Sequence, residues 1–219
     1  MSGDELLRAL GVILVSYLVG AIPSGYIAGR LLKGIDVRDY GSGATGATNV
    51  MRSLGRWPFV IVLVTDALKG YVPVIVTWFL FGSHDLQVAS GLAAVLGHDF
   101  PVYIGFRGGR GVATSFGVYA AMALPVTFGL VAVGVFIVLA FRYMSLMSVI
   151  TVPLGALILL AFALSGTDPE HYTYSKAVFG LFATAFVVIR HIPNIRRLVR
   201  GTEPKIGGRR RARPRAGAT

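Results

Sequence analysis

The stretch VATSFGVYAAMALPVTFGLVAVGVFIVLAF, residues 112–141, decides the fold. It carries no charge over 30 residues, whereas one membrane-spanning helix needs only about 20. The positions of Lys and Arg resolve this ambiguity, because cytoplasmic segments of membrane proteins are rich in both. If the stretch crosses twice, 18 of the 21 Lys and Arg residues lie on one side; if it crosses once, Arg142 and the basic C-terminus move outside. We therefore predict two spans here.

The composition of the whole chain agrees with a membrane protein. Of its 219 residues 54% are hydrophobic and only 14% are charged, against about 25% charged residues in ordinary soluble domains. We predict an all-α polytopic membrane protein with seven transmembrane helices, the N-terminus outside and the C-terminus cytoplasmic. The expected spans are Leu6–Ala28, Trp57–Phe81, Leu86–Ile104, Val112–Leu124, Pro125–Phe141, Leu146–Leu164 and Tyr174–Ile189.

The chain divides into one membrane domain and a short tail. Residues 1–206 are expected to form a single seven-helix domain, whereas residues 207–219 are rich in Arg, lack apolar periodicity and are expected to be disordered. We interpret the basic tail as attracted to anionic lipid head groups and not to nucleic acid. The chain has no cysteine, which excludes disulfides, a thiolate nucleophile and cysteine metal ligands.

A glycine-rich polar loop, GSGATGATNVMR, occupies residues 41–52 between two apolar stretches. Its glycines allow the backbone to approach a ligand closely. Its hydroxyl and amide side chains donate hydrogen bonds, and the Arg52 guanidinium matches phosphate in shape. The loop therefore predicts a site for a phosphorylated compound at the membrane surface. It also spells the dinucleotide fingerprint G-x-G-x-x-G, which we reject because membrane spans and not a βαβ unit flank the loop.

Two further polar clusters fall on the same predicted side of the membrane. Residues 106–114, FRGGRGVAT, place a Gly-Gly-Arg-Gly turn before a helix, which offers backbone N–H groups and the Arg110 guanidinium to an anion. Residues 190–198, RHIPNIRRL, close the last span with His191 and Asn194 three residues apart, although Pro193 makes the local helix uncertain. The structural alternatives are a turn with snorkelling arginines and an interfacial helix cap.

The second span contains Asp66 and Lys69 at an i, i+3 spacing. Ionisable residues are costly in a membrane, so we predict a mutual ion pair, with direct substrate contact as the alternative. Other catalytic motifs are missing: no His-x-x-x-x-Asp follows any of the four histidines, and no Gly-x-Ser-x-Gly occurs. The carboxylates are scattered, which argues against a two-metal site.

The three polar clusters, in this order, resemble those of the bacterial acyl-phosphate:glycerol-3-phosphate acyltransferases, the PlsY family. The resemblance covers the chain from about Ser16 to Ile206. The matching residues are Gly41-Ser42-Gly43, Gly46 to Val50 and Arg52; Gly97-His98, Phe100-Pro101, Phe106, Gly108-Gly109 and Gly111 to Thr114; His191, Asn194-Ile195, Arg197-Leu198 and Gly201 to Lys205; and Asp66, Lys69 and Gly70. Two positions depart from the family pattern. Ala44 replaces the usual Asn, and Arg110 replaces the usual Lys, which keeps the charge but changes its shape.

The resemblance implies an enzyme that transfers a fatty acyl group from acyl phosphate to the 1-hydroxyl of glycerol 3-phosphate, giving lysophosphatidic acid and phosphate. It implies membrane lipid as surroundings, without a cofactor, metal, nucleic acid or obligate protein partner. The implied location is the bacterial inner (cytoplasmic) membrane, with the active site facing the cytoplasm. The expected catalytic residues are Ser42, Arg52, Arg110, His191 and Asn194, and the expected substrate-binding residues are Gly43, Gly46, Thr48, Asn49, Gly108, Gly109 and Ser148.

The chemistry of this reaction fits the sequence, because acyl phosphate is already activated and needs no acyl-enzyme nucleophile. Positioning and charge neutralisation remain for the protein. The Ser42–Asn49 loop is assigned to the donor phosphate, and the glycerol phosphate is assigned to Arg52, Arg110, Ser148, His191 and Asn194. Two groups remain open as acceptors of the hydroxyl proton, the donor's own phosphate and His191.

An anion or phosphate transporter with cytoplasmic arginine gates is the alternative from a different class. It would also place glycine loops and arginines near the bilayer. Transporter sites lie near the midplane, however, and this chain has only Asp66 and Lys69 there. The one-sided distribution of the polar clusters therefore favours the enzyme.

Overall fold

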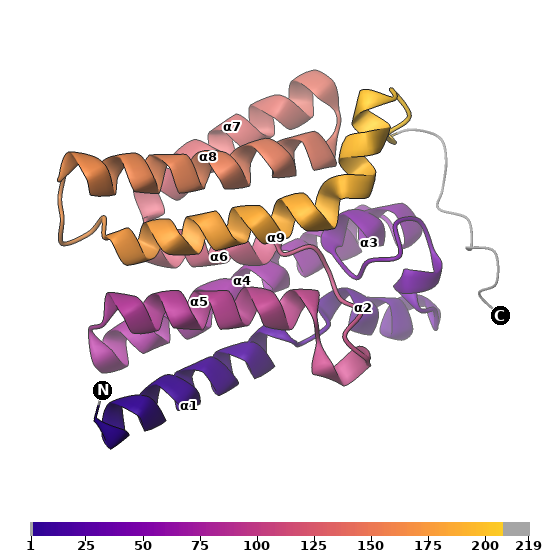
Figure 1. Ribbon diagram of the computed structural model, residues 1–219. Coiled ribbons are helices and arrows are strands. Elements are labelled where there is room, and N and C mark those ends of the chain that lie inside the picture. Colours follow the sequence, from indigo (N-terminus) through magenta and orange to yellow (C-terminus); the bar gives the residue numbers. More distant parts are fainter. Residues whose placement is uncertain (1, 208–219) are drawn as a thin grey trace.

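The computed structural model describes residues 2–207, which form a bundle of α-helices (Figure 1). The helices are α1 (Gly3–Gly20), α2 (Ser24–Lys33), α3 (Ala47–Ser53), α4 (Arg56–Phe81), α5 (His84–Asp99), α6 (Val112–Met122), α7 (Leu124–Phe141), α8 (Met144–Ser165) and α9 (Tyr174–Val199), with 3₁₀ helices η1 (Val37–Asp39) and η2 (Val102–Ile104). The expected tail, residues 207–219, lies outside the described residues except for Gly207.

Long apolar helices make up most of the bundle. Five stretches are long and apolar enough to cross a membrane, namely residues 3–33, which join α1 and α2, together with α4, α7, α8 and α9. These helices agree with the prediction of an all-helical integral membrane protein. Helices also occupy the other two expected spans, but α5 has 16 residues and α6 has 11. The number of crossings stays a prediction.

Proline accounts for two differences between the helices and the expected spans. The first expected span, Leu6–Ala28, is not one helix, because α1 ends at Gly20 and α2 begins after Pro23. The third, Leu86–Ile104, ends early: α5 stops at Asp99, and Phe100 before Pro101 leaves the helical conformation. Proline lacks an N–H group and disfavours the helical conformation of the residue that precedes it.

Residues 112–141 do form two helices. They meet at Ala123, whose backbone (φ −156°, ψ 71°) interrupts the helix. The last helix instead extends beyond the expected end at Ile189, through Pro193 to Val199. Figure 1 shows α9 bending near its C-terminal end, and an internal proline is a common cause of such a bend. The continuation places His191 and Asn194 on one helix.

Small residues allow α4 and α6 to approach closely. A Cβ atom on Gly117 of α6 would lie 1.9 Å from the carbonyl oxygen of Ala67 in α4, and a Cβ atom on Gly70 of α4 would lie 2.2 Å from the carbonyl oxygen of Thr114 in α6. Close backbone contact of this kind drives helix association in membranes, where apolar burial between helices contributes little. The crossing fixes the relative position of two helices that carry residues of the candidate site.

The polar clusters of the sequence meet at one end of the bundle. The segment between α2 and α4, the α5–α6 connection, the α7–α8 turn and the end of α9 lie together there, while the N-terminus and the α8–α9 connection lie at the opposite end (Figure 1). Clusters that are more than 100 residues apart in the chain are therefore neighbours in space.

Replacing Gly117 by Ala is expected to destabilise the α4–α6 crossing, because the new methyl group overlaps the backbone of Ala67. Overpacking of this kind costs about 1–3 kcal/mol, and the midpoint of thermal unfolding in detergent should fall accordingly. The matched control is Gly129→Ala in α7, where nothing lies within 4 Å of the added Cβ atom. Equal midpoints for the two variants would contradict the packing argument.

Candidate active site

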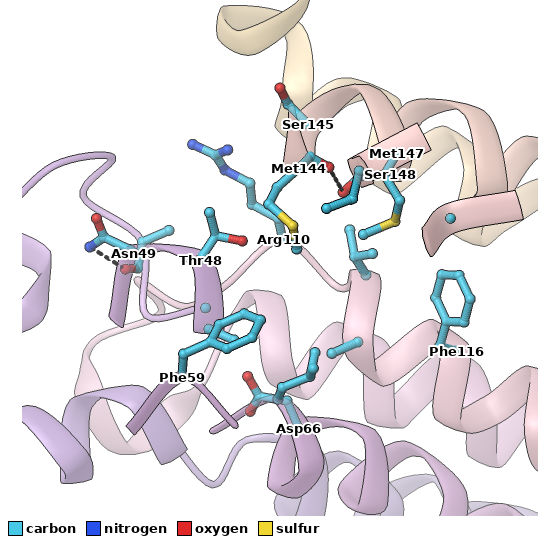
Figure 2. A pocket seen from close by; sticks show the side chains of 18 of the residues that line it. Thr48, Asn49, Phe59, Asp66, Arg110, Phe116, Met144, Ser145, Met147 and Ser148 are labelled. Carbon is cyan, nitrogen blue, oxygen red and sulfur yellow. Dashed lines mark hydrogen bonds between the residues drawn. The ribbon is translucent and has the colours of Figure 1, made fainter. Parts of the chain in front are cut away.

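A cavity of about 480 Å³ extends from the polar end of the bundle between α4 and α6 on one side and α7 and α8 on the other (Figure 2). Figure 2 shows Arg110 between Thr48 of α3 and Ser145 of α8, with Phe116 of α6 farther along the cavity. The polar wall consists of Ser42, Thr48, Asn49, Arg52, Asp66, His98, Arg110, Ser145, Ser148, His191, Asn194 and Glu203. The apolar wall includes Phe59, Leu63, Val112, Phe116, Val131, Val135, Val138, Leu139 and Met147.

The first glycine loop is organised by the buried side chain of Asn49. Its Nδ2 donates to the carbonyl oxygens of Val37 at 2.7 Å and Ala44 at 2.9 Å, and its Oδ1 accepts from the N–H of Ser42 at 3.0 Å. The loop also needs a left-handed residue at Gly43 (φ 73°), a conformation that glycine adopts without strain. Asn49 thus holds the loop in shape, and the Ser42 hydroxyl is left at the cavity wall.

The two adjacent glycines of the second loop, Gly108 and Gly109, are packed too tightly for a side chain. A Cβ atom on Gly109 would lie 1.8 Å from Nε2 of His98, and one on Gly108 would lie 2.1 Å from the His98 carbonyl oxygen. The two loops are joined directly, because the N–H of Thr45 donates to the carbonyl oxygen of Gly108 at 3.3 Å. Backbone packing therefore requires glycine at position 108, whereas a side chain at position 109 would displace the buried ring of His98. Arg110 is the first side chain of the loop that reaches the cavity.

A chain of short hydrogen bonds connects Arg110 to Glu203. Nη1 of Arg110 donates to Oδ1 of Asn194 at 2.6 Å, and Nδ2 of Asn194 donates to Oε1 of Glu203 at 2.6 Å. The Glu203 carboxylate also accepts hydrogen bonds from the Ser145 hydroxyl at 2.8 Å and from Nε of Arg197 at 2.7 Å. Glu203 is only 5% exposed, and a buried charge of this kind requires such partners. The network fixes the carboxamide of Asn194 so that its oxygen faces Arg110.

The charges in this network affect one another. Burial, together with the nearby Arg197, lowers the pKa of Arg110 to about 10. Burial likewise lowers the pKa of Arg52, and its approach to Glu203 only partly offsets this. Burial also opposes ionisation of Glu203, but hydrogen bonds from Asn194, Arg197 and Ser145 outweigh it and keep the pKa of Glu203 below its ordinary value. Three arginines thus share one carboxylate, and an anionic ligand would relieve their excess charge.

His191 is buried at the cavity wall with a defined orientation. Its Nδ1 lies 2.8 Å from the carbonyl oxygen of Val187. A carbonyl oxygen can only accept, so Nδ1 carries the proton and Nε2 of the neutral ring has a free lone pair. His191 is therefore arranged to accept a hydrogen bond from a hydroxyl group in the cavity.

Asp66 and Lys69 form the ion pair that their spacing predicted. Nζ of Lys69 lies 2.8 Å from Oδ1 of Asp66 and also donates to the carbonyl oxygen of Ile22 at 2.9 Å. Nδ1 of His98 lies 3.6 Å from the same carboxylate oxygen. Asp66 also reaches the cavity wall, but its charge is committed to Lys69.

All five residues that were predicted to be catalytic line this one cavity: Ser42, Arg52, Arg110, His191 and Asn194. Of the seven predicted to bind substrate, Gly46, Thr48, Asn49 and Ser148 also line it. Gly43, Gly108 and Gly109 do not line it. No group of three or more His, Asp or Glu side chains within residues 2–207 could hold a metal ion.

Sequence reasoning assigned no role to several cavity residues. Glu203 belongs to a motif that the sequence singled out, but only the fold brings it together with Asn194 and Ser145. His98 was part of a matched motif, and its place under the second loop was not foreseen. A single glutamate after a helix does not indicate that it will be buried. The one available signal was the pair Arg196 and Arg197 at the end of α9, which favours a carboxylate nearby as a counter-charge.

The apolar wall of the cavity is open at the flank of the bundle. Val131, Val135 and Leu139 lie on one face of α7 and line the cavity. The same three side chains are 44%, 52% and 75% exposed. The cavity is thus polar at its arginine end and has exposed apolar side chains at its other end, a surface that suits lipid acyl chains.

Comparisons with known proteins agree on one family. A protein-family model described as glycerol-3-phosphate acyltransferase matches residues 10–201. A glycerol-3-phosphate acyltransferase of Parasynechococcus marenigrum (strain WH8102) is 45% identical over 205 residues, covering 92% of each chain. One of Gloeobacter violaceus is 43% identical over 203 residues, covering 91% of this chain and 95% of the relative.

Two crystal structures of PlsY (YgiH), an integral membrane glycerol 3-phosphate acyltransferase, have the same fold. The glycerol 3-phosphate form is 38% identical, with a TM-score of 0.83 over 91% of this chain and 96% of that one. The lysophosphatidic acid form is 37% identical, with a TM-score of 0.80, and the match covers 91% of this chain and 95% of that one.

Proposed function

Because this chain belongs to the PlsY family of glycerol-3-phosphate acyltransferases, we propose that its cavity brings an acyl phosphate and glycerol 3-phosphate together for acyl transfer to the 1-hydroxyl group. The protein is a glycerol-3-phosphate acyltransferase that produces lysophosphatidic acid, and it is a multi-pass integral membrane protein. Membership of this family removes the reason to consider a transporter.

One observation carries the proposal: a single cavity combines an arginine-rich end with an apolar wall that opens to lipid. The two substrates each carry a phosphate, and the acyl donor also carries a long apolar chain. The phosphates fit the Arg52 and Arg110 end, and the chain fits the α7 wall formed by Val131, Val135 and Leu139. The same opening lets lysophosphatidic acid leave sideways into the bilayer.

The proposed reaction needs no covalent enzyme intermediate. The 1-hydroxyl oxygen of glycerol 3-phosphate bonds to the carbonyl carbon of the acyl phosphate, the bond from that carbon to the phosphate oxygen breaks, and inorganic phosphate leaves with its electron pair. The protein contributes positioning of the two substrates and stabilisation of negative charge. Ser42 and the backbone of its loop are assigned to the donor phosphate.

The glycerol phosphate is assigned to Arg52 and Arg110, with Ser148, His191 and Asn194 around it. Asn194 holds the Arg110 guanidinium in place at 2.6 Å. The free Nε2 of His191 accepts a hydrogen bond from a glycerol hydroxyl. Two groups compete for the proton of the attacking hydroxyl, Nε2 of His191 and an oxygen of the departing phosphate. The latter loses its bond to carbon in the same step and gains basicity.

The acyl donor is expected to be acyl phosphate and not acyl-CoA. The sequence has no His-x-x-x-x-Asp motif, so no histidine–aspartate base of that type is available for a thioester donor. The test supplies detergent-purified protein with glycerol 3-phosphate and either donor, and follows lysophosphatidic acid and released phosphate. Acyl phosphate should support turnover with equal amounts of both products. Equal turnover with acyl-CoA under matched conditions would overturn the proposal.

The phosphate clamp predicts a specific pattern among arginine variants. Arg52→Ala and Arg110→Ala each remove a charge-assisted contact worth roughly 1.5–3 kcal/mol, so kcat/KM for glycerol 3-phosphate should fall about ten- to more than a hundredfold. Arg110→Lys keeps the charge and should retain substantial activity. The matched control is Arg107→Ala, because Arg107 is exposed, belongs to the same loop and does not line the cavity. If Arg107→Ala were crippled and Arg110→Ala nearly normal, the anion site would be misplaced.

We also propose seven crossings with the active site on the cytoplasmic face of the inner membrane. The charge asymmetry of the loops supports this orientation. Topology reporters placed after Phe81 and after Gly166 should be extracytoplasmic, and a reporter fused at Thr219 should be cytoplasmic. A reporter at Thr219 outside the cell would mean that residues 112–141 cross once.

A further inference from the structure

We propose that Arg190, which lies outside the cavity, is a positioning residue that holds the second glycine loop so that Arg110 points at the substrate. Arg190 directly precedes His191 on α9, but it does not line the cavity. The inference rests on the proposed role of Arg110 as a phosphate ligand. It assigns a function to a cation that substrate contact does not explain.

The contact between Arg190 and the loop is specific. Nη2 of Arg190 donates to the carbonyl oxygen of Gly109 at 2.7 Å, and Nε donates to the same oxygen at 3.2 Å. The guanidinium also stacks over the ring of Phe100, with 5.5 Å from its central carbon to the ring centroid. Two donors in a planar fork, together with a ring face, define one orientation that an ammonium group cannot reproduce.

Among residues 2–207, Arg190 is the one side chain that hydrogen-bonds to the backbone of Gly108 or Gly109. Gly108 donates its N–H to the carbonyl oxygen of Asp99 at 3.2 Å and accepts from Thr45 at 3.3 Å, and Gly109 donates its N–H to the carbonyl oxygen of His98 at 3.0 Å. The Gly109 carbonyl is the fourth backbone group of the pair, and Arg190 satisfies it. Gly109 is buried, so losing Arg190 would leave a buried acceptor without a partner, which the loop would avoid by moving.

Arg190 and Asn194, both on α9, hydrogen-bond to consecutive residues of the loop. They are four residues apart on α9, about one helical turn, and they bind the carbonyl of Gly109 and the guanidinium of Arg110. The contact with the Gly109 carbonyl fixes the backbone from which the side chain of Arg110 extends. The contact with Asn194 fixes its guanidinium group. A displacement of about 1 Å at such a ligand can cost about a hundredfold in rate, so the first contact matters even though it never touches substrate.

The test is a double-mutant cycle between Arg190→Gln and Arg110→Ala, with kcat/KM for glycerol 3-phosphate as the measurement. Arg190→Gln alone should lower kcat/KM about ten- to a hundredfold. In the Arg110→Ala background the same substitution should lower it less than about twofold, because there is no longer a guanidinium to position. Equal losses in both backgrounds would show a general structural role, and no loss in either would show no role; both results would overturn the inference.

Controls separate this inference from the proposed site. Arg110→Ala alone tests the site: if it were fully active, the assignment of Arg110 would fail and the inference with it. If Arg110→Ala is impaired and the cycle is additive, only the inference fails. Arg196→Gln is the matched control on α9, because Arg196 is exposed and outside the cavity, and it should be nearly normal. If Arg190→Gln does not yield monodisperse protein, Arg190→Lys replaces it in the double-mutant cycle. Its loss of kcat/KM should be smaller, and it should again be much weaker in the Arg110→Ala background.

Discussion

The candidate site depends on one constraint: buried polar backbone groups must find their hydrogen-bond partners inside the protein. Two glycine loops lie at the polar end of the bundle, and part of their backbone is buried, as at Gly108 and Gly109. The carboxamide of Asn49 supplies partners for the first loop, and the guanidinium of Arg190 completes the second. The loops also bond to each other through Thr45 and Gly108. Loops fixed in this way can present Ser42 and Arg110 without moving when an anion arrives.

The second property of the site is an excess of positive charge held at fixed positions. Arg52, Arg110 and Arg197 surround the single carboxylate of Glu203. The carboxylate oxygens of Glu203 already accept hydrogen bonds from Asn194, Arg197 and Ser145. Glu203 therefore neutralises little of the charge on the other arginines. A site of this kind is poised for a dianionic phosphate. Because hydrogen bonds already orient Arg110 and Arg197, anion binding there costs little reorganisation, which is the basis of electrostatic preorganisation in catalysis.

The shape of the cavity links this charged end to the lipid. A soluble enzyme would have to extract a fatty acyl chain from the membrane into an enclosed pocket. In the proposed reaction the chain stays beside α7 while only its activated head group enters the polar end, since Val135 lines the cavity and is also exposed. The small-residue crossing of α4 and α6 at Gly70 and Gly117 keeps the opposite wall in place.

The sequence by itself determined the class of the protein, because uncharged stretches such as residues 112–141 have few alternatives to helices in a bilayer. It also indicated the three polar clusters and the ion pair of Asp66 and Lys69, whose partners are close in the chain. Helix ends at Pro23 and Pro101 were missed, although proline signals them locally. All five expected catalytic side chains line one cavity, and their catalytic roles stay a prediction.

Only the tertiary structure decided how these clusters act on one another. Arg110 and Asn194 are 84 residues apart, and Ser145 and Glu203 are 58 apart. Such contacts depend on which helix faces lie against each other, and α9 had to continue through Pro193 to bring Asn194 into place. The roles of Glu203 and Arg190 follow from these long-range contacts. A charged side chain in a sequence does not reveal whether it will lie in water or against a buried carbonyl, because packing between distant helices makes that choice.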